Sequence, residues 1–394
     1  MAGPFQIDSS DPGSRARAGV LHTPHGDIRT PAFVPLATKA TVKGLEPREV
    51  TDLGYDLILG NTYHLFLEPG HELIARFGGL HEFMGWDGPI VTDSGGFQVF
   101  SMGHGNVAAE IKKTGGPTGS PSAVKIEERG VTFRSHLDGS KRFMAPETSM
   151  EVQAALGSDL ALVFDECTPF HVTREYTARS TERTHRWLER CLDWHDRHGP
   201  EGQLVFGIVQ GGVFEDLRTE SAHVIAASRA DGVAIGGSLG ADKPQMYEVV
   251  EMATSVLPEA PPRHLLGIGD IDDLVRGVEL GIDTFDCAMP TRLGRHGMAL
   301  VPDPEKRWRV DLAKARWRHS DEPLLEGCPC AACAQGWTRG YWHYLTRNRE
   351  LTGQRMLTLH NLAFVQRVVA RLRDGLLSGD LAGIAAAIRG GAAP

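Results

Sequence analysis

Leu204-Val-Phe-Gly-Ile-Val209 is a six-residue run without a charged side chain, and runs of this kind decide the fold class. A short stretch that is apolar on both faces is expected of a parallel strand buried on both sides. The segment after it, from Val213 to Ala230, has helical periodicity, as does Thr173 to His198 before it. The pattern therefore predicts buried strands that alternate with helices.

Seven further runs of this kind recur along the chain. They span residues 32–36, 56–60, 89–92, 160–164, 232–236, 264–268 and 282–285. Eight strand–helix units predict an α/β fold, a (β/α)8 TIM-type barrel, whose active site lies at the carboxyl ends of the strands. A doubly wound open sheet is the alternative. Polar side chains or glycine follow six of the runs at this end: Asn61, Asp93, Asp165, Gln210, Gly237 and Asp286.

Composition and charge narrow the class of protein. The 394 residues are 41% hydrophobic and 23% charged, as in a soluble globular protein, and no apolar run is long enough to span a membrane. Met1 to Val20 lacks the apolar stretch of a secretory signal, so a cytoplasmic enzyme is expected. A net charge of −9 argues against a protein that coats nucleic acid indiscriminately, yet it permits a local basic patch. The candidates for such a patch are Lys43, Arg292, Arg295, Arg339, Arg347, Arg349 and Arg355.

Two carboxylates carry the strongest chemical signal. Asp286 ends the apolar run in Thr284-Phe-Asp-Cys-Ala-Met-Pro-Thr-Arg-Leu-Gly-Arg295, and Asp93 ends another in Gly88-Pro-Ile-Val-Thr-Asp-Ser-Gly-Gly-Phe-Gln98. A carboxylate among apolar neighbours can be a covalent nucleophile, and two carboxylates are the minimum for breaking and remaking a glycosidic bond with retention. Arginines close by could hold phosphates. The alternative is that both aspartates only cap turns, since Asp before Ser-Gly-Gly is a common turn former.

The sequence predicts a barrel with two additions. Residues 1–303 form the barrel, with an insertion at about 103–150 that contains a flexible Gly/Pro stretch (112–122) and a hairpin around Arg129-Gly130. Residues 304–389 form a mostly helical, zinc-binding subdomain packed on the barrel. Residues 390–394 are expected to be a flexible tail.

Three cysteines within six residues indicate a metal site rather than a disulfide framework. Cys328, Cys330 and Cys333, with His360 as the fourth ligand, would close a tetrahedral zinc shell and leave no open position. A closed shell is structural, so one Zn2+ per subunit is expected to support folding. His343 is an alternative fourth ligand.

Seven motifs in register resemble one family. The chain is similar, from about residue 5 to 380, to the bacterial-type queuine/tRNA-guanine ribosyltransferases (tRNA-guanine transglycosylases). The motifs are Asp93-Ser-Gly-Gly-Phe-Gln98, Phe133-Arg-Ser-His-Leu-Asp-Gly-Ser140, Phe164-Asp-Glu-Cys-Thr-Pro169, Phe206-Gly-Ile-Val-Gln-Gly-Gly212, Ala234-Ile-Gly-Gly237, Phe285-Asp-Cys-Ala-Met-Pro-Thr-Arg292 and the cysteine cluster with His360.

The resemblance implies a homodimer that acts on tRNA. It would exchange the wobble guanine of GUN anticodons (Tyr, His, Asn and Asp tRNAs) for 7-aminomethyl-7-deazaguanine (preQ1), a step of queuosine biosynthesis. Asp286 would be the nucleophile and Asp93 the general acid/base. Lys43, Arg292 and Arg295 would contact the tRNA. The residues that the resemblance places around the base are Asp165, Gln210, Gly236, Gly237, Phe97, Cys167 and Leu266.

Departures from the family pattern leave alternatives open. Ser238 and Gly240 stand where bacterial members have other residues, and a small residue at 240 would make room for queuine, so a queuine-preferring enzyme is the second choice. Base exchange on DNA is disfavoured only by motif detail. A retaining glycosidase would be expected to have tryptophans near the strand ends. A non-catalytic tRNA-binding subunit would be expected to lack Asp93 or Asp286, whereas this chain has both aspartates. Six of the seven tryptophans lie outside the strand ends, at positions 187, 194, 308, 317, 337 and 342.

Overall fold

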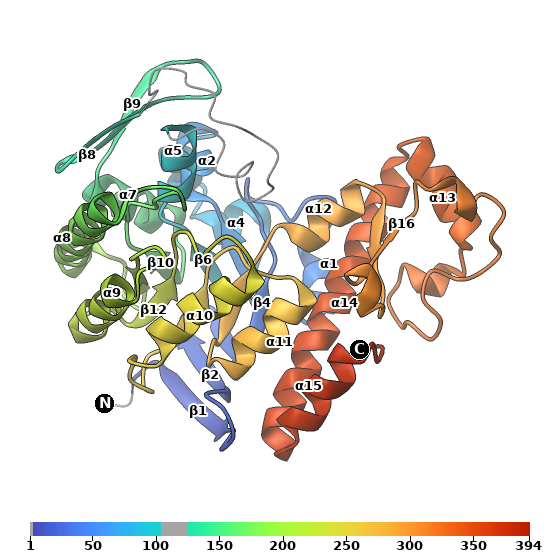
Figure 1. The fold of residues 1–394 in the computed structure, drawn as a ribbon. Helices are drawn as coiled ribbons and strands as arrows, with labels where there is room; N and C mark the ends of the chain where they lie inside the picture. Colours follow the sequence, from blue (N-terminus) through green and yellow to red (C-terminus); the bar gives the residue numbers. More distant parts are fainter. Residues whose placement is uncertain (1–2, 104–123) are drawn as a thin grey trace.

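Eight parallel strands close into a barrel in the computed structural model, which describes residues 3–103 and 124–394 (Figure 1). Neighbouring strands pair in the order β4-β14-β13-β12-β11-β10-β6-β5, and a parallel bridge between Leu36 and Leu59 joins the two ends of this series. The prediction of a barrel rather than an open sheet is confirmed. All eight predicted strands are present: β4 (Ala32–Val34), β5 (Ile58–Gly60), β6 (Ile90–Thr92), β10 (Leu160–Leu162), β11 (Leu204–Val209), β12 (Gly232–Ile235), β13 (Arg263–Leu265) and β14 (Thr284–Asp286).

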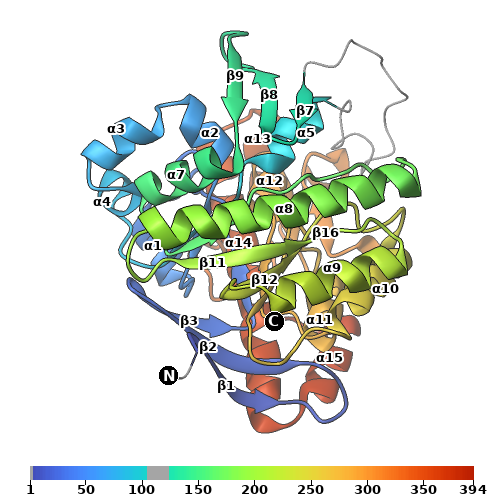
Figure 2. The ribbon, with the colours of Figure 1, turned by 90° about the vertical axis from the view of Figure 1, so that its left-hand side faces the viewer.

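Amphipathic helices cover the outside of the barrel. The two helices predicted from periodicity are observed as α8 (Arg174–His198) and α9 (Glu215–Ala227). Figure 2 shows these two helices side by side, outside β11 and β12. Gly207 in β11 allows this close packing, because a Cβ atom there would lie 2.7 Å from Ile225 of α9. The remaining helices of residues 3–103 and 124–303 are α1 (Pro47–Asp52), α2 (Thr62–Leu67), α3 (His71–Arg76), α4 (Leu80–Met84), α5 (Gly96–Gly103), α7 (Pro146–Leu156), α10 (Lys243–Thr254), α11 (Ile271–Glu279) and α12 (Met289–Arg295).

The insertion after α5 contains an antiparallel sheet. The predicted hairpin around Arg129-Gly130 is observed as β7 (Lys125–Glu127) and β8 (Gly130–Arg134), and β9 (Lys141–Met144) adds a third strand that was not predicted. The predicted flexible stretch, 112–122, lies outside the described residues. The division of the chain at residues 303 and 389 stays a prediction.

A second antiparallel sheet, which was not predicted, packs at the amino-terminal end of the barrel strands. It consists of β1 (Phe5–Ser10), β2 (Arg17–Thr23) and β3 (Gly26–Thr30), all antiparallel. Arg17 of β2 is almost fully buried and pairs at 2.7 Å with Asp283, which directly precedes β14. This buried pair fixes the sheet to the end of the barrel opposite the strand carboxyl ends.

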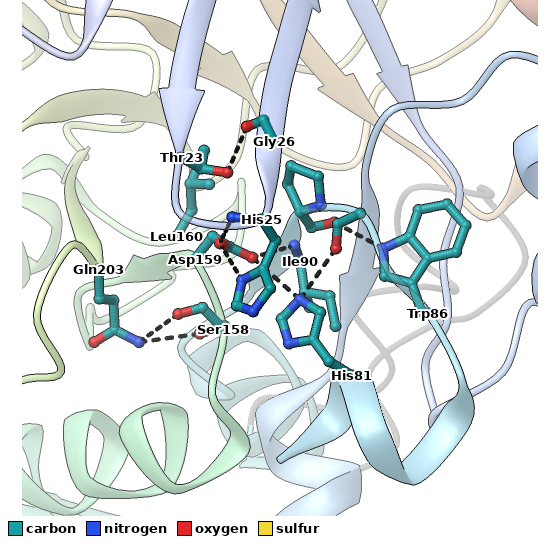
Figure 3. A network of polar contacts seen from close by, with 12 residues as sticks. Thr23, His25, Gly26, His81, Trp86, Ile90, Ser158, Asp159, Leu160 and Gln203 are labelled. Atoms are coloured by element: carbon teal, nitrogen blue, oxygen red, sulfur yellow. Dashed lines mark hydrogen bonds and ion pairs between the residues drawn. The ribbon is translucent and has the colours of Figure 1, made fainter. Parts of the chain in front are cut away.

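Two histidines and one aspartate strengthen the same junction (Figure 3). The buried Asp159 carboxylate, directly before β10, lies 2.7 Å from His25 Nδ1 and 3.3 Å from His81 Nε2, and it accepts the Ile90 amide at 2.8 Å. The imidazole rings of His25 and His81 stack 3.7 Å apart and tilt by only 18°. A ring nitrogen presents its lone pair in the plane of its own ring. Because the two rings are stacked, an ion in the plane of one ring would lie out of the plane of the other. We therefore interpret the cluster as a hydrogen-bonded link between the sheet and the barrel rather than as a metal site.

The C-terminal region is mainly helical and packs against the barrel. The long helix α14 (Leu351–Ser378) contacts β4 and α11, and its Leu362 carbonyl accepts a hydrogen bond from Tyr55 at 2.8 Å. Gly294 of α12 allows close contact, since a Cβ atom there would lie 2.5 Å from the Thr358 amide nitrogen. The other elements of this region are β15 (Met298–Leu300), β16 (Arg309–Asp311), α13 (Arg339–Arg347), α15 (Leu381–Arg389) and the short 3-10 turns Pro304–Lys306, Ala315–Trp317 and Cys333–Gln335.

Strand structure also occurs after residue 303, the predicted end of the barrel. There β16 pairs with β15 in a separate antiparallel sheet. Within residues 3–103 and 124–394, none of the helices combines the length and the apolar character needed to cross a bilayer.

Candidate functional site

Asp93 follows β6 and is held by donors from the segment after the neighbouring strand β5 and from its own loop. Its Oδ1 accepts the Thr62 amide at 2.9 Å and the Gly95 amide at 3.1 Å, while Oδ2 accepts the Asn61 side-chain amide. Burial raises the pKa of Asp93 to about 7; the Thr62 and Gly95 amides oppose this shift, and the nearby charge of Asp286 adds to it. A carboxyl group with a pKa near neutrality can both donate and accept a proton at physiological pH.

Asp286 is the last residue of β14, and one of its two oxygens is anchored. Oδ1 accepts the Gly267 amide at 2.9 Å and lies 3.2 Å from Nε2 of the buried His264. The Nδ1 atom of His264 lies 2.8 Å from the Thr284 hydroxyl, which can donate to it and so place the ring proton on Nε2. Among the described residues, no hydrogen bond to Oδ2 is found, so this oxygen is available to a substrate.

A group of polar residues, here called the polar pocket, follows strands β10 and β11, which lie between β6 and β14 in the barrel. Asp165, three residues after β10, is 5% exposed and accepts hydrogen bonds from Gln210 at 2.5 Å and Ser94 at 3.2 Å. Burial raises the pKa of Asp165 to about 6, against the opposing effect of these two donors. Gln210 follows β11 and uses its amide nitrogen for Asp165, while its Oε1 is buried without a partner among the described residues. The pocket therefore offers a carboxylate and a free amide oxygen to the donors of a ligand.

The glycines after β12 leave the pocket open. Gly237 has φ +78°, and a Cβ atom there would clash with the Gln210 Oε1 atom. At Gly236 a Cβ atom would lie 2.8 Å from Ile208 and 3.1 Å from Leu266, which places Leu266 beside the same wall.

Cys167 and Phe97 were the other residues expected around the base. Burial raises the pKa of the Cys167 thiol, which is also affected by the charge of Asp165 and by a hydrogen bond with the Gly237 backbone. Phe97, in the first turn of α5, is 42% exposed, as a ring available for stacking would be.

The three predicted tRNA contacts lie around the same end of the barrel. Lys43 is exposed in the segment between β4 and α1, and it is one of the charges that act on His64 of α2. Arg292 is exposed on α12 and Arg295 is half-buried in the last turn of that helix. None of the three forms an ion pair with a carboxylate in the described part of the chain.

The cysteine cluster and His360 come together as predicted and could hold a metal ion. The His360 Nδ1 atom lies 3.3, 3.5 and 3.9 Å from the sulfurs of Cys333, Cys330 and Cys328. Metal–sulfur and metal–nitrogen bonds of about 2.3 and 2.05 Å at a tetrahedral angle give a sulfur–nitrogen separation of about 3.6 Å, so the four residues fit a zinc-sized ion.

Interactions around the cluster prepare it for an ion. His360 Nε2 lies 2.8 Å from the Leu300 carbonyl, which fixes the proton there and leaves Nδ1 free to ligate. The Arg367 guanidinium lies 3.3 Å from the Cys328 sulfur, where it stabilises a thiolate. The alternative ligand His343 is directed elsewhere, since its Nδ1 lies 2.8 Å from the Leu312 carbonyl.

Comparison with known proteins agrees with this geometry. A family model described as "Queuine tRNA-ribosyltransferase" matches residues 11–390. The chain belongs to the queuine tRNA-ribosyltransferase family. The curated "Queuine tRNA-ribosyltransferase" of Roseiflexus sp. (strain RS-1) is 51% identical, over 96% of this chain and 97% of that protein. Proteins of the same name from Pelotomaculum thermopropionicum (48% identical; 97% and 96% covered) and Symbiobacterium thermophilum (45% identical; 97% and 90% covered) are also similar.

Sequence reasoning missed two supporting residues. His264 lies inside an apolar run, where a polar residue in a buried strand is the available signal. Arg218 of α9 is fully buried and donates to the carbonyls of Gly212 (2.7 Å), Val209 (2.9 Å) and Ser238 (3.0 Å). It thereby ties the loops after β11 and β12 together behind the pocket, and burial lowers its pKa to about 10.

Proposed function

We propose that this chain is a tRNA-guanine transglycosylase that replaces the wobble guanine of GUN anticodons with preQ1, in queuosine biosynthesis. The observation that carries the proposal is the placement of Asp93 and Asp286 at strand carboxyl ends beside the Asp165–Gln210 pocket. Family membership supports it, since relatives covering nearly the whole chain are named for queuine and tRNA. The GUN anticodons, preQ1 and the covalent step rest on the resemblance and on the chemistry of these residues.

The proposed reaction is a double displacement on the ribose. Asp286 Oδ2 attacks the anomeric carbon, the carbon–nitrogen bond to guanine breaks, and Asp93 gives its proton to the departing base. The incoming deazaguanine then loses its ring N–H proton to Asp93, and its nitrogen attacks the same carbon and expels Asp286. The two displacements together retain the configuration of the anomeric carbon. Asp93 is again protonated at the end, so the exchange needs no other co-reactant. The pKa of Asp93, about 7, suits both transfers.

Recognition of the base is assigned to the polar pocket. Asp165, with a pKa of about 6, is ionised at neutral pH and can accept the ring N–H and amino protons that guanine and preQ1 share. Gln210 Oε1 and the backbone at Gly236 and Gly237 would hold the other edge of the base. Phe97 would stack on the purine, which has to leave its place in the anticodon loop to be reached.

We keep preQ1 as the incoming base and queuine as the alternative. Gly240 has φ +118°, and a Cβ atom there would lie 2.8 Å from the Gln245 side chain. The backbone thus supplies its own reason for glycine at this position. The small residue therefore does not by itself indicate a pocket enlarged for queuine.

The remaining expectations are part of the same proposal. Zn2+ in the Cys3His site would be structural, because four protein ligands leave no position for a substrate. A homodimer in the cytoplasm is expected from the resemblance. A retaining glycosidase is disfavoured by the tryptophans, which lie before β6, in α8 and in the C-terminal region rather than after the strands.

Guanine exchange is the direct test. Labelled guanine is incubated with unmodified tRNA-Tyr and with the same tRNA whose wobble guanine has been replaced. We expect label to enter only the first substrate, and competition by unlabelled preQ1 at lower concentration than by queuine. Label in neither tRNA, with folded and metal-loaded protein, would refute base exchange and leave a non-catalytic subunit or another polymer as the explanation. Label in both would refute the wobble position as the site of exchange.

A further inference from the structure

A second cavity, distinct from the base pocket, lies at the junction of the barrel and the C-terminal helices. It has a volume of about 550 Å³ and is formed by the end of α12, the end of α13 and the first turns of α14. Its polar lining is Arg295, His296, Thr346, Arg347, Arg349 and Gln354. None of the lining residues is acidic.

The three arginines of this cavity have no carboxylate partner in the part of the chain that the structure describes. Across residues 3–103 and 124–394, neither Arg295 nor Arg347 nor Arg349 forms an ion pair with a carboxylate. Two other arginines that the sequence placed in the same basic patch are neutralised, Arg339 by Glu322 at 2.9 Å and Arg355 by Glu49. Among the described residues, the cavity arginines therefore differ from Arg339 and Arg355 in having no carboxylate partner, although the net charge of the chain is −9.

Arg295 has an unsatisfied guanidinium nitrogen at this cavity. Its Nη1 atom is buried and has no hydrogen-bond partner among the described residues. Burial and, second, the neighbouring charge of Arg292 lower the pKa of Arg295. A buried guanidinium nitrogen without an acceptor is unfavourable, so a bound anion would relieve this site.

Backbone conformation brings the third arginine to the cavity. Arg349 has φ +56°, an unusual conformation for a residue with a side chain, in the turn between α13 and α14. Gly297, with φ +74°, allows α13 to approach, because a Cβ atom there would clash with Thr346. Strained residues persist where the surrounding structure fixes them, and they cluster at binding sites.

We propose that this three-arginine cavity binds a phosphodiester of the RNA substrate, beside the reacting nucleotide. Guanidinium groups match phosphate oxygens in geometry as well as in charge. Arg295 is at the far end of α12 from Asp286, and seven residues at about 1.5 Å each make the helix about 10 Å long. The cavity therefore suits the phosphate of a neighbouring nucleotide better than that of the nucleotide under attack. The proposal rests on the proposed function, since it takes RNA to be the substrate.

The test measures binding of an anticodon stem-loop RNA by fluorescence anisotropy at salt concentrations from about 50 to 300 mM. The double variant Arg347→Gln/Arg349→Asn removes two charges; Asn is chosen at 349 because it tolerates a left-handed backbone. Arg197→Gln is the control for loss of a positive charge away from the cavity, since Arg197 is exposed at the end of α8, near the amino-terminal ends of the barrel strands. Thermal unfolding of each variant confirms that the fold is retained.

We expect the double variant to weaken RNA binding roughly tenfold at about 100 mM salt, and to lower the salt slope by about 0.7 for each phosphate that the protein no longer neutralises. The KM for guanine should stay unchanged, and the control should match the wild type. An unchanged slope in the double variant would overturn the proposal. A second result would also overturn it: inorganic phosphate binds the wild type but not the double variant, and it does not compete with RNA. The cavity would then bind a free anion rather than the RNA backbone. If the wild type binds RNA without exchanging guanine, the proposed function fails while the salt slope still decides the role of the cavity.

Discussion

The unusual carboxyl group of Asp93 has a measurable effect on stability. Its pKa is raised by burial to about 7, whereas the unfolded chain has the ordinary value of 3.8. Between these two values the folded state binds more protons than the unfolded state, so the free energy of unfolding must fall as the pH rises. The destabilisation is absent below pH 3.8 and complete above about pH 7.

The size of this effect follows from the two pKa values. From about pH 5 to pH 8, one carboxyl group with these values lowers the free energy of unfolding by about 2.6 kcal/mol. The Asp93 side chain is only partly buried. Solvent screening therefore reduces the expected change to about 1–2 kcal/mol.

The variant Asp93→Asn isolates the effect, because it removes the titration and keeps the shape of the side chain. Urea unfolding of the wild type and the variant at several pH values from about 5 to 8, with the metal site loaded, gives the difference in unfolding free energy. We expect the wild type to lose about 1–2 kcal/mol relative to the variant over this range, and the variant to lose roughly 10²–10⁴-fold in guanine exchange. A difference that stays constant with pH would refute the raised pKa and with it the physical basis of the acid/base role.

Three further predictions concern the neighbouring residues. Gly237→Ala places a Cβ atom against Gln210 Oε1 at a left-handed backbone position, so the KM for guanine should rise roughly tenfold; an unchanged KM would remove Gly237 from the base pocket. His264→Ala removes a donor 3.2 Å from Asp286 and should lower single-turnover exchange roughly 10–100-fold without changing the KM for guanine, whereas His264→Asn should restore part of the rate; equal rates in both variants would count against this positioning role. Cys330→Ser should lose the metal ion proposed for the Cys3His cluster and unfold at a lower temperature, and a metal-free protein with the wild-type melting temperature would contradict a structural role.

The fold was predictable where burial leaves a strong pattern in the sequence. The barrel strands are buried on both faces, so they appear as short apolar runs, and the cysteine spacing identified the metal cluster because thiolates so close in sequence have few other uses. β1 was missed because only one of its faces is buried: Phe5 is inside, whereas Gln6 is exposed. A strand of this kind is difficult to distinguish from a polar segment.

The parts of the site that were missed share a different cause. Arg218 is a charged residue on an amphipathic helix and is expected to face solvent, but it is buried among backbone carbonyls that only the tertiary fold brings together. The arginine cavity is similar. Arg347 and Arg349 were candidates for a basic patch, and only the structure shows that they meet Arg295 while Arg339 and Arg355 are neutralised.

The covalent link between Asp286 and RNA is the central claim. Wild-type protein is incubated with an anticodon stem-loop RNA, quenched in denaturant, and digested with nuclease and trypsin. Mass spectrometry of the peptide 277–292, which contains both Asp283 and Asp286, then locates any remaining ribose. We predict a ribosyl adduct on Asp286 in the wild type, and none in Asp286→Ala although this variant still binds the RNA. An adduct that persists in Asp286→Ala, or that maps to another residue, would contradict the account.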